Sequence, residues 1–333
     1  MPRRNPYYQG PVSDHFDGQR FFSHAEPPRR GLRANLRFVA GQMQRRWAMP
    51  PRAVTPDRPP VRVDGLRLVP IGHSSVLIQI AGLNLLIDPV FADWLGPRPG
   101  MGPRRCHPPG IAWDDLPPID AVLLTHNHWD HLEGPGIARL WQRFGCRVLA
   151  PLGNDAILRG YEPGMRAEAL DWGQSARLSE RVTAHLAPAY HWSGRHLLDQ
   201  RMALWGSWLL TDDRGGVLYH VGDTAYMDGR IFREVRETFG PPDVALIPIG
   251  AYEPRWFVGT QHVSPEEAVR ILLDCGAPRA FGHHWGCFQL TWEAWDAPPR
   301  DLAAALSSHG LPPDRFQPFQ PGQAVAPDWP GTT

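Results

Sequence analysis

The hydrophobic pattern of this 333-residue chain changes character near residue 66. From there, short apolar runs of strand length recur, and turn-forming residues separate them. Two runs are joined by the tight turn Ala81-Gly82. Strands alternating with helices favour an α/β fold in one large domain. The predicted strands cover residues 66–71, 75–80, 83–88, 121–125, 147–150, 182–187, 202–211, 217–221 and 244–248.

Two helices are predicted from capping and periodicity. Ser264 followed by Pro265, with Glu267 at the third helical position, predicts a capped helix start, and Gly276 predicts its end. Nearer the N-terminus, apolar residues recur at spacings of three or four with arginines on the other faces, which predicts an amphipathic helix within 31–47: Leu32, Leu36, Val39, Met43 and Trp47. Two interpretations are open: the helix docks on the body of the protein, or it binds an anionic lipid surface.

Composition divides the chain into three parts. Residues 1–60 contain eleven arginines and four acidic residues, a surplus of seven positive charges, and they are rich in Pro and Gly. This composition predicts an extended basic arm that carries the one amphipathic helix. Residues 61–318 form the predicted domain, and residues 319–333 a Pro- and Gly-rich C-terminal tail.

Charge and cysteine content narrow the function classes. The formal net charge is zero, which argues against a nucleic-acid partner. The four cysteines show no C-x-x-C pairing and predict reduced thiols. The first residues lack the apolar region of a signal peptide, and no stretch approaches the roughly 20 apolar residues of a membrane span. We expect a cytoplasmic protein; peripheral contact with the inner membrane surface and a homodimer are both left open.

The residues that carry chemistry follow the predicted strand 121–125. The run His126-Asn127-His128-Trp129-Asp130-His131 places four metal-ligand side chains within six residues. Imidazole suits zinc and carboxylate is the harder ligand, so the cluster can serve two adjacent divalent ions. Three further candidates follow apolar runs elsewhere: His191, Asp223 and His284. Each alone is more often structural, but together they predict a metal site at the strand ends.

With these residues the chain resembles the metallo-β-lactamase superfamily and, within it, the N-acyl-phosphatidylethanolamine-hydrolysing phospholipase D family. The resemblance covers about residues 69–286 and includes Met101-Gly102-Pro103-Arg104-Arg105 and Gly250-Ala251-Tyr252-Glu253-Pro254-Arg255-Trp256-Phe257. It implies the four-layer αβ/βα sandwich, in which helices flank two mixed β-sheets. It also implies a phospholipid substrate, cleaved at the phosphodiester to phosphatidic acid and an N-acyl-ethanolamine.

The resemblance further implies how the ligands divide between two zinc ions. His126, His128 and His191 belong to one ion, whereas Asp130, His131 and His284 belong to the other. Asp223 bridges both ions, and Asp130 and Asp223 are the implied catalytic residues. Metal pairs about 3.5–4 Å apart activate water for hydrolysis near neutral pH. Iron or manganese in place of one or both zinc ions is left open.

Five residues are candidates for binding the substrate or supporting the ligands: Gln261, His262, Arg255, Trp256 and Tyr252. A structural ion pair of Arg255 with Glu253 or another acid is the competing interpretation, as is a purely supporting role for Gln261 and His262. Two other functions stay open. One is a lactonase or a phosphodiesterase of soluble metabolites on the same site, and the other is a non-catalytic zinc-binding protein.

Overall fold

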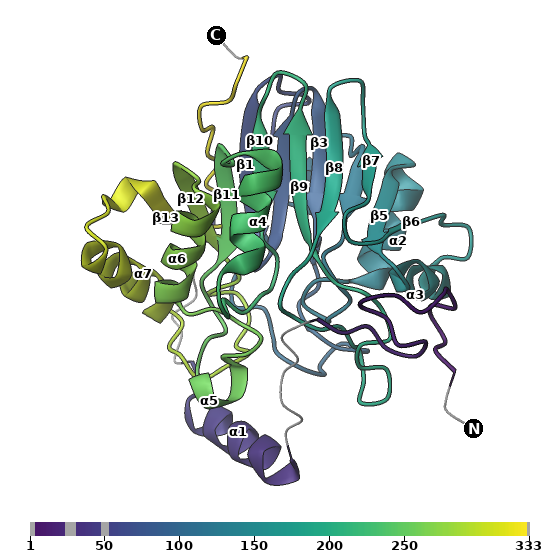
Figure 1. The fold of residues 1–333 in the computed structure, drawn as a ribbon, viewed down its shortest axis with the longest axis vertical. Coiled ribbons are helices and arrows are strands. Elements are labelled where there is room, and N and C mark those ends of the chain that lie inside the picture. Colours follow the sequence, from purple (N-terminus) through teal and green to yellow (C-terminus); the bar gives the residue numbers. More distant parts are fainter. Residues whose placement is uncertain (1–3, 24–30, 48–52, 332–333) are drawn as a thin grey trace.

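Two β-sheets packed face to face form the centre of the molecule (Figure 1). The structure is a computed structural model that describes residues 4–23, 31–47 and 53–331. The first sheet has the strand order β1-β2-β3-β4-β5-β6 and the second β13-β12-β11-β10-β9-β8-β7, and both mix parallel with antiparallel pairs. Helices cover both outer faces, so the predicted αβ/βα sandwich is confirmed.

The first sheet comes from the N-terminal half of the chain. Its strands are Leu66–Gly72 (β1), Ser75–Ile80 (β2), Leu83–Ile87 (β3), Ala121–Leu123 (β4), Arg147–Pro151 (β5) and Glu168–Leu170 (β6). Helices Gly134–Phe144 (α2) and Asn154–Tyr161 (α3) pack on its outer face, and the short helix Trp113–Asp115 (η1) precedes β4. At the β2–β3 turn, Ala81 and Gly82 both have positive φ, as a tight hairpin requires.

The second sheet comes from the C-terminal half. Its strands are Ser175–Arg177 (β7), Val182–Ala187 (β8), Ser207–Asp212 (β9), Val217–His220 (β10), Val244–Pro248 (β11), Arg279–His283 (β12) and Phe316–Pro318 (β13). Helices Arg230–Phe239 (α4), Pro265–Cys275 (α6) and Ala297–Ser308 (α7) pack on its outer face. Two short helices, Arg255–Val258 (α5) and Pro313–Arg315 (η2), complete this half. The predicted capping box of Ser264 and Glu267 at α6 is confirmed.

The period of two along each strand decides which side chains face which layer. In β2, Val76, Ile78 and Ile80 point between the sheets, whereas Leu77 points outward toward α2. The predicted strand 202–211 pairs only from Ser207 onward. Leu204 is buried ahead of it without strand pairing, because its main-chain N–H donates to Leu152 in a loop. Residues 202–205 are thus buried without belonging to a sheet.

Both ends of the chain pack on the sandwich. In the predicted arm, Phe16 and Phe21 are 1% and 0% exposed and join the core between the sheets. In the predicted tail, Val325 bridges Leu68 and Trp329 is buried. Aromatic side chains stabilise both segments although both are rich in Pro and Gly. The three-part division of the chain remains a prediction.

Helix Leu32–Gln44 (α1) lies within the predicted segment 31–47 and docks on the body through one face. Phe38 stacks on Phe257 of α5 at 4.2 Å between ring centroids. Gly41 faces the Trp292 ring so closely that a Cβ there would overlap it. The Trp292 indole N–H donates to the main-chain oxygen of Phe38 at 2.9 Å. No helix in the described part of the chain has both the length and the apolar character needed to span a bilayer.

Candidate metal centre

The predicted ligands meet at one end of the sandwich because the strands that precede them run in the same direction. Strands β8 and β10 are both antiparallel to β9, and β11 and β12 continue parallel to β10. His191, Asp223 and His284 therefore follow strand ends on the same edge. His126 to His131 follow β4 of the facing sheet. This edge is the lower end of the molecule in Figure 1.

The first cluster consists of His126, His128 and His191. The Nδ1 atom of His128 lies 2.8 Å from Nε2 of His126 and 3.2 Å from Nε2 of His191. The Nδ1–H of His191 donates to the main-chain oxygen of Gln261 at 2.9 Å, which turns its Nε2 toward the other two rings. The three imidazoles can therefore offer one nitrogen each to a common ion.

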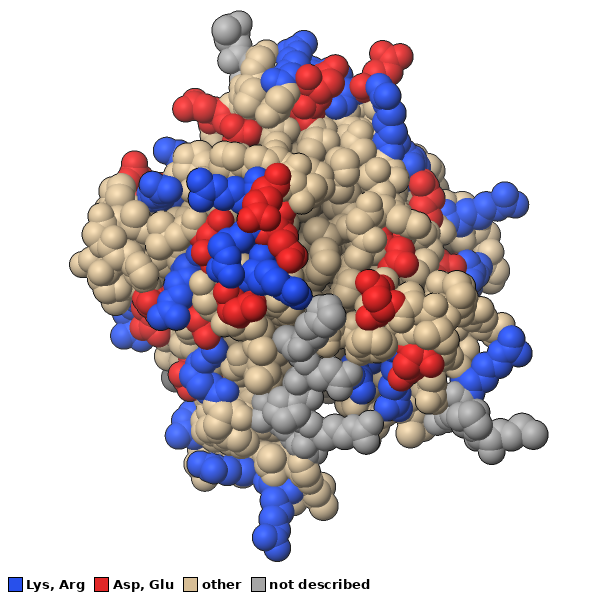
Figure 2. Space-filling view, in the orientation of Figure 1, with Lys and Arg blue, Asp and Glu red and all other residues tan. Residues whose placement is uncertain are grey.

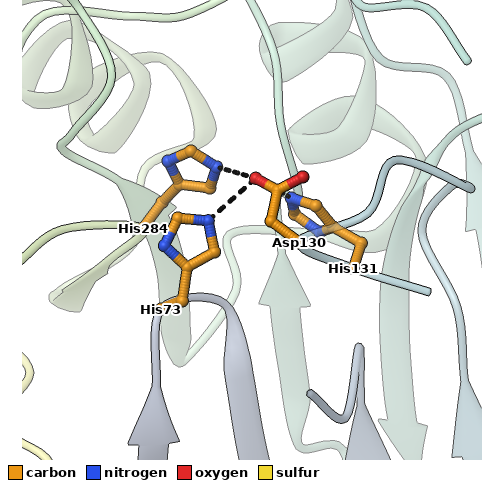
Figure 3. Close-up of side chains that lie close together, drawn as sticks. All are labelled: His73, Asp130, His131 and His284. Atoms are coloured by element: carbon orange, nitrogen blue, oxygen red, sulfur yellow. Dashed lines mark hydrogen bonds and ion pairs between the residues drawn. The ribbon is translucent and has the colours of Figure 1, made fainter. Parts of the chain in front are cut away.

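The second cluster contains the predicted ligands Asp130, His131 and His284, together with His73 (Figure 3). Oδ2 of Asp130 lies 2.9 Å from Nε2 of His73, 3.4 Å from Nε2 of His284 and 3.6 Å from Nε2 of His131. His73 also accepts the main-chain N–H of His284 through its carbonyl oxygen at 3.0 Å. One residue of the β1–β2 turn thus contacts two predicted ligands.

The Asp223 carboxylate lies between the two clusters. Its Oδ2 is 3.2 Å from Nε2 of both His131 and His284, and 3.7 Å and 3.9 Å from Nε2 of His191 and His126. It therefore contacts members of both predicted ligand sets. A single carboxylate in this position has the geometry to bridge two cations.

The buried polar atoms at the centre are suited to binding cations. The Nε2 atoms of His131 and His284 and both oxygens of Asp223 are buried without a well-aligned hydrogen bond. Burial alone would raise the pKa of Asp223, yet His284 and His131 hold it well below its usual range. Burial also opposes charge on His284, but Asp223 and Asp130 outweigh it and raise its pKa to about 9. Two buried carboxylates thus demand positive charge, which divalent ions can supply.

The sequence analysis missed two residues at this centre, His73 and Asp88. Asp88 directly follows β3, is fully buried, and lies 2.7 Å from Nδ1 of His131 through its Oδ2. His73 lies two residues after the predicted strand 66–71, and Asp88 is the last residue of the predicted strand 83–88. The same strand-end signal that identified Asp223 was therefore present at each of them.

A pocket of about 460 Å³ opens at the centre. The predicted ligands His128, Asp130 and Asp223 line it together with Gln261 and His262. Several apolar and aromatic side chains complete the lining: Leu95, Trp129, Trp192, Leu197 and Leu290. The Nδ1 atom of His262 lies 3.8 Å from Oδ2 of Asp223. Both residues therefore face the centre, Gln261 also through its carbonyl oxygen bound to His191.

The three other candidate substrate residues have different surroundings. Nη2 of Arg255 forms an ion pair with both carboxylate oxygens of Glu267, at 2.9 and 2.7 Å, whereas Glu253 accepts only the main-chain N–H of Arg255 at 3.3 Å. The Trp256 ring lies under the Arg37 guanidinium of α1 at 4.7 Å. Tyr252 donates its hydroxyl to Asp301. None of the three is among the residues that line the pocket, and their role in substrate binding stays a prediction.

Comparisons with known proteins agree with this geometry. A family model described as "Beta-lactamase superfamily domain" matches residues 83–285. An uncharacterised protein of Mycobacterium tuberculosis is 38% identical over 304 residues, which are 87% of this chain and 80% of that protein. N-acyl-phosphatidylethanolamine-hydrolyzing phospholipase D 1 of Caenorhabditis elegans is 33% identical over 250 residues, 73% of this chain and 70% of that protein.

A solved structure supports the fold. The metallo hydrolase Igni18 of the archaeon Ignicoccus hospitalis aligns with a TM-score of 0.58 at 20% sequence identity, over 78% of this chain and 97% of that one. This likeness shows the fold alone, whereas the family model and the nematode relative show the family. The chain belongs to the metallo-β-lactamase superfamily and is a metal-dependent hydrolase similar to N-acyl-phosphatidylethanolamine-hydrolysing phospholipase D.

Proposed function

We propose that this hydrolase cleaves the phosphodiester bond of N-acyl-phosphatidylethanolamine, or of a closely related glycerophospholipid, to give phosphatidic acid and N-acyl-ethanolamine. The observation that carries the proposal is the buried Asp223 carboxylate between two histidine clusters at the floor of a pocket. The nematode phospholipase D, 33% identical to this chain, supports the choice of substrate. The apolar lining of the pocket suits a substrate with an acyl chain.

Two zinc ions are part of this proposal. His126, His128 and His191 hold one ion, Asp130, His131 and His284 hold the other, and Asp223 bridges them. Bound divalent ions supply a water-derived nucleophile at neutral pH and offset the negative charge of a phosphodiester. Elemental analysis of the purified protein tests the ions: two zinc equivalents per chain are expected, and one metal or none contradicts the bridge. A finding of two equivalents of iron or manganese agrees with the bridging role of Asp223 and changes only which metal is bound.

Hydrolysis in oxygen-18 water tests the reaction. Attack at phosphorus puts the label on phosphatidic acid, which mass spectrometry detects, whereas attack at carbon puts it on the alcohol product. Label on the N-acyl-ethanolamine contradicts the proposed reaction. Opening of a lactone or cleavage of a soluble diester, without turnover of the lipid, decides for the alternative hydrolase. Metal content without any turnover decides for a zinc-binding protein.

The second part of the proposal is that α1 holds the enzyme at an anionic lipid surface. Four apolar residues of α1, here called the outer stripe, are strongly exposed: Leu32 at 74%, Leu36 at 59%, Val39 at 51% and Met43 at 64%. With about 100° per residue, the outer stripe points roughly opposite Gly41, which faces Trp292. The two interpretations of this helix are therefore compatible, because docking uses the other face.

Charge and position both favour a lipid partner. Residues 31–47 contain four arginines and no acidic residue, and Figure 2 shows basic side chains projecting at the lower end of the molecule, over α1. The helix packs on the segment that forms the pocket wall: Gln42 donates to the main-chain oxygen of Gln289 at 3.1 Å, and the neighbouring Leu290 lines the pocket. Leu197 of the lining is itself 86% exposed. An apolar, basic surface thus adjoins the pocket.

Sedimentation with vesicles tests this partner. Vesicles of phosphatidylcholine with phosphatidylglycerol should bind the protein, and vesicles of phosphatidylcholine alone should bind it more weakly. Raising the ionic strength should reduce the difference, because salt screens charges over about 10 Å at 0.1 M. Equal binding to both vesicle types contradicts a role of the arginines in membrane binding. Binding to neither vesicle type contradicts the proposed lipid partner.

A further inference from the structure

We infer that Asp88 fixes the ring tautomer of one histidine in each metal site, His131 directly and His126 through the hydroxyl group of Thr125. The inference rests on the two-metal centre proposed above. It makes Asp88 and Thr125 positioning residues: they act on the metal ions through the ligands that they hold.

The carboxylate of Asp88 is fully buried where β3 ends. Its Oδ1 accepts the main-chain N–H of Thr125 at 2.8 Å. Its Oδ2 lies 2.6 Å from Oγ1 of Thr125 and 2.7 Å from Nδ1 of His131. Oγ1 of Thr125 in turn lies 2.9 Å from Nδ1 of His126. A single hydrogen-bonded chain therefore joins one carboxylate to rings of both clusters.

The positions of the protons follow from what each group can do. The Thr125 hydroxyl donates to Oδ2 of Asp88, since carboxylate oxygens accept hydrogen bonds. The Thr125 oxygen then accepts the Nδ1–H of His126, and His131 donates its own Nδ1–H to Asp88. Each ring keeps the lone pair of Nε2, and each Nε2 faces Asp223, at 3.9 Å for His126 and 3.2 Å for His131. This is the form in which a neutral imidazole binds a metal.

Asp88→Asn reverses the direction of these hydrogen bonds with little change in the size of the side chain. Oδ1 stays with the Thr125 N–H, so an amide N–H replaces the acceptor Oδ2. The ring of His131 must then accept at Nδ1 and carry its proton at Nε2, where the ion binds. The Thr125 hydroxyl, now an acceptor for the amide, turns its proton toward His126 with the same effect. Loss of an orienting partner of this kind lowers metal affinity about 10- to 100-fold.

Thr125→Val separates the two sites. It removes the hydroxyl, which lies 2.9 Å from Nδ1 of His126 and 3.4 Å from Nδ1 of His131, and leaves the shorter 2.7 Å contact of Asp88 with His131. Each purified holoenzyme is exposed to increasing chelator, and the zinc retained per chain is measured. Asp88→Asn should release both equivalents at about 10- to 100-fold lower chelator concentration. Thr125→Val should release one equivalent early and the other as in the wild type, and Thr125→Ser should keep both. Ring ¹⁵N NMR of the loaded protein should show the Nδ1–H tautomer in wild type.

Asp212→Asn is the matched control. Asp212 is also buried, as the last residue of β9, but its Oδ2 accepts from the Trp329 indole at 3.0 Å and pairs with Arg181 at 2.8 Å. This variant should melt at a lower temperature and keep both metals. Wild-type metal retention in Asp88→Asn, or equal metal loss in Asp212→Asn, overturns the inference. If Asp88→Asn does not fold, matching zinc release by Thr125→Val and Thr125→Ser overturns it. Because the readout is metal, failure to cleave the lipid contradicts only the proposed substrate.

Discussion

Replacing Leu36 and Met43 of the outer stripe by serine should weaken binding to anionic vesicles and leave the fold intact. Full burial of a Leu or Met side chain contributes about 1.5–3 kcal/mol. The two side chains are 59% and 64% exposed, so a lipid surface can bury roughly 60% of each. The double variant should therefore lose about 1.8–3.6 kcal/mol of binding, which is about 20- to 400-fold in affinity.

Two measurements read this variant. Vesicle sedimentation gives the affinity, and hydrolysis is compared between vesicular lipid and a soluble short-chain diester. Turnover of vesicular lipid should fall with the affinity, while hydrolysis of the soluble diester and the melting temperature should stay within error of wild type. The last two are expected to hold because the outer stripe makes up the solvent-facing side of α1.

Three matched variants guard the interpretation. Leu273→Ser removes an apolar side chain that is 40% exposed on α6 and should leave vesicle binding unchanged. Gly41→Val forces α1 away from Trp292 and should lower stability and both activities together. Deletion of residues 1–50 is a poorer test, since it also removes Phe16 and Phe21 from the core. Unchanged vesicle binding in the outer-stripe variant refutes the lipid partner, and a lowered melting temperature refutes the assignment of that face to solvent.

Asp223→Ala takes a ligand from both ions, so turnover should fall by more than about 100-fold, beyond the effect of losing a supporting residue. His309 pairs with Glu266 and belongs to none of the histidine clusters, so His309→Ala should stay near wild type, and comparable losses in the two variants contradict the bridge. Since the pKa of His284 is raised to about 9, zinc uptake at pH 7 should release protons and weaken as the pH falls. Calorimetry in buffers of different ionisation enthalpy measures the proton release, and zinc binding without proton release contradicts a protonated His284 in the metal-free protein. Burial lowers the pKa of His220 to about 4, so the unfolded chain binds more protons and stability falls from about pH 6.5 toward pH 4, by at most about 3 kcal/mol. His220→Gln should reduce the drop in melting temperature over this range, and an unchanged drop contradicts this assignment.

The sequence by itself determined the features that depend on neighbouring residues. The capping box at Ser264 and Glu267 satisfies main-chain groups within one helical turn, so its signal is local. The strands 75–80 and 182–187 are bounded as the apolar runs predicted. The cluster His126 to His131 follows its strand directly, which made it visible without any knowledge of the fold.

Tertiary structure decided which distant residues join that cluster. His73 reaches Asp130 across 57 residues and Asp88 reaches His131 across 43, so neither contact follows from local spacing. Packing also gave Arg255 the partner Glu267.

The orientation of α1 shows the same limit. Periodicity identified the helix and its apolar stripe, but Phe38 and Gly41 on the opposite face dock on Trp292, which is some 250 residues away along the chain. An apolar stripe in the sequence indicates only that burying these side chains would be favourable. Which face is buried within the chain depends on the shape of a surface that forms only after the two sheets have packed together.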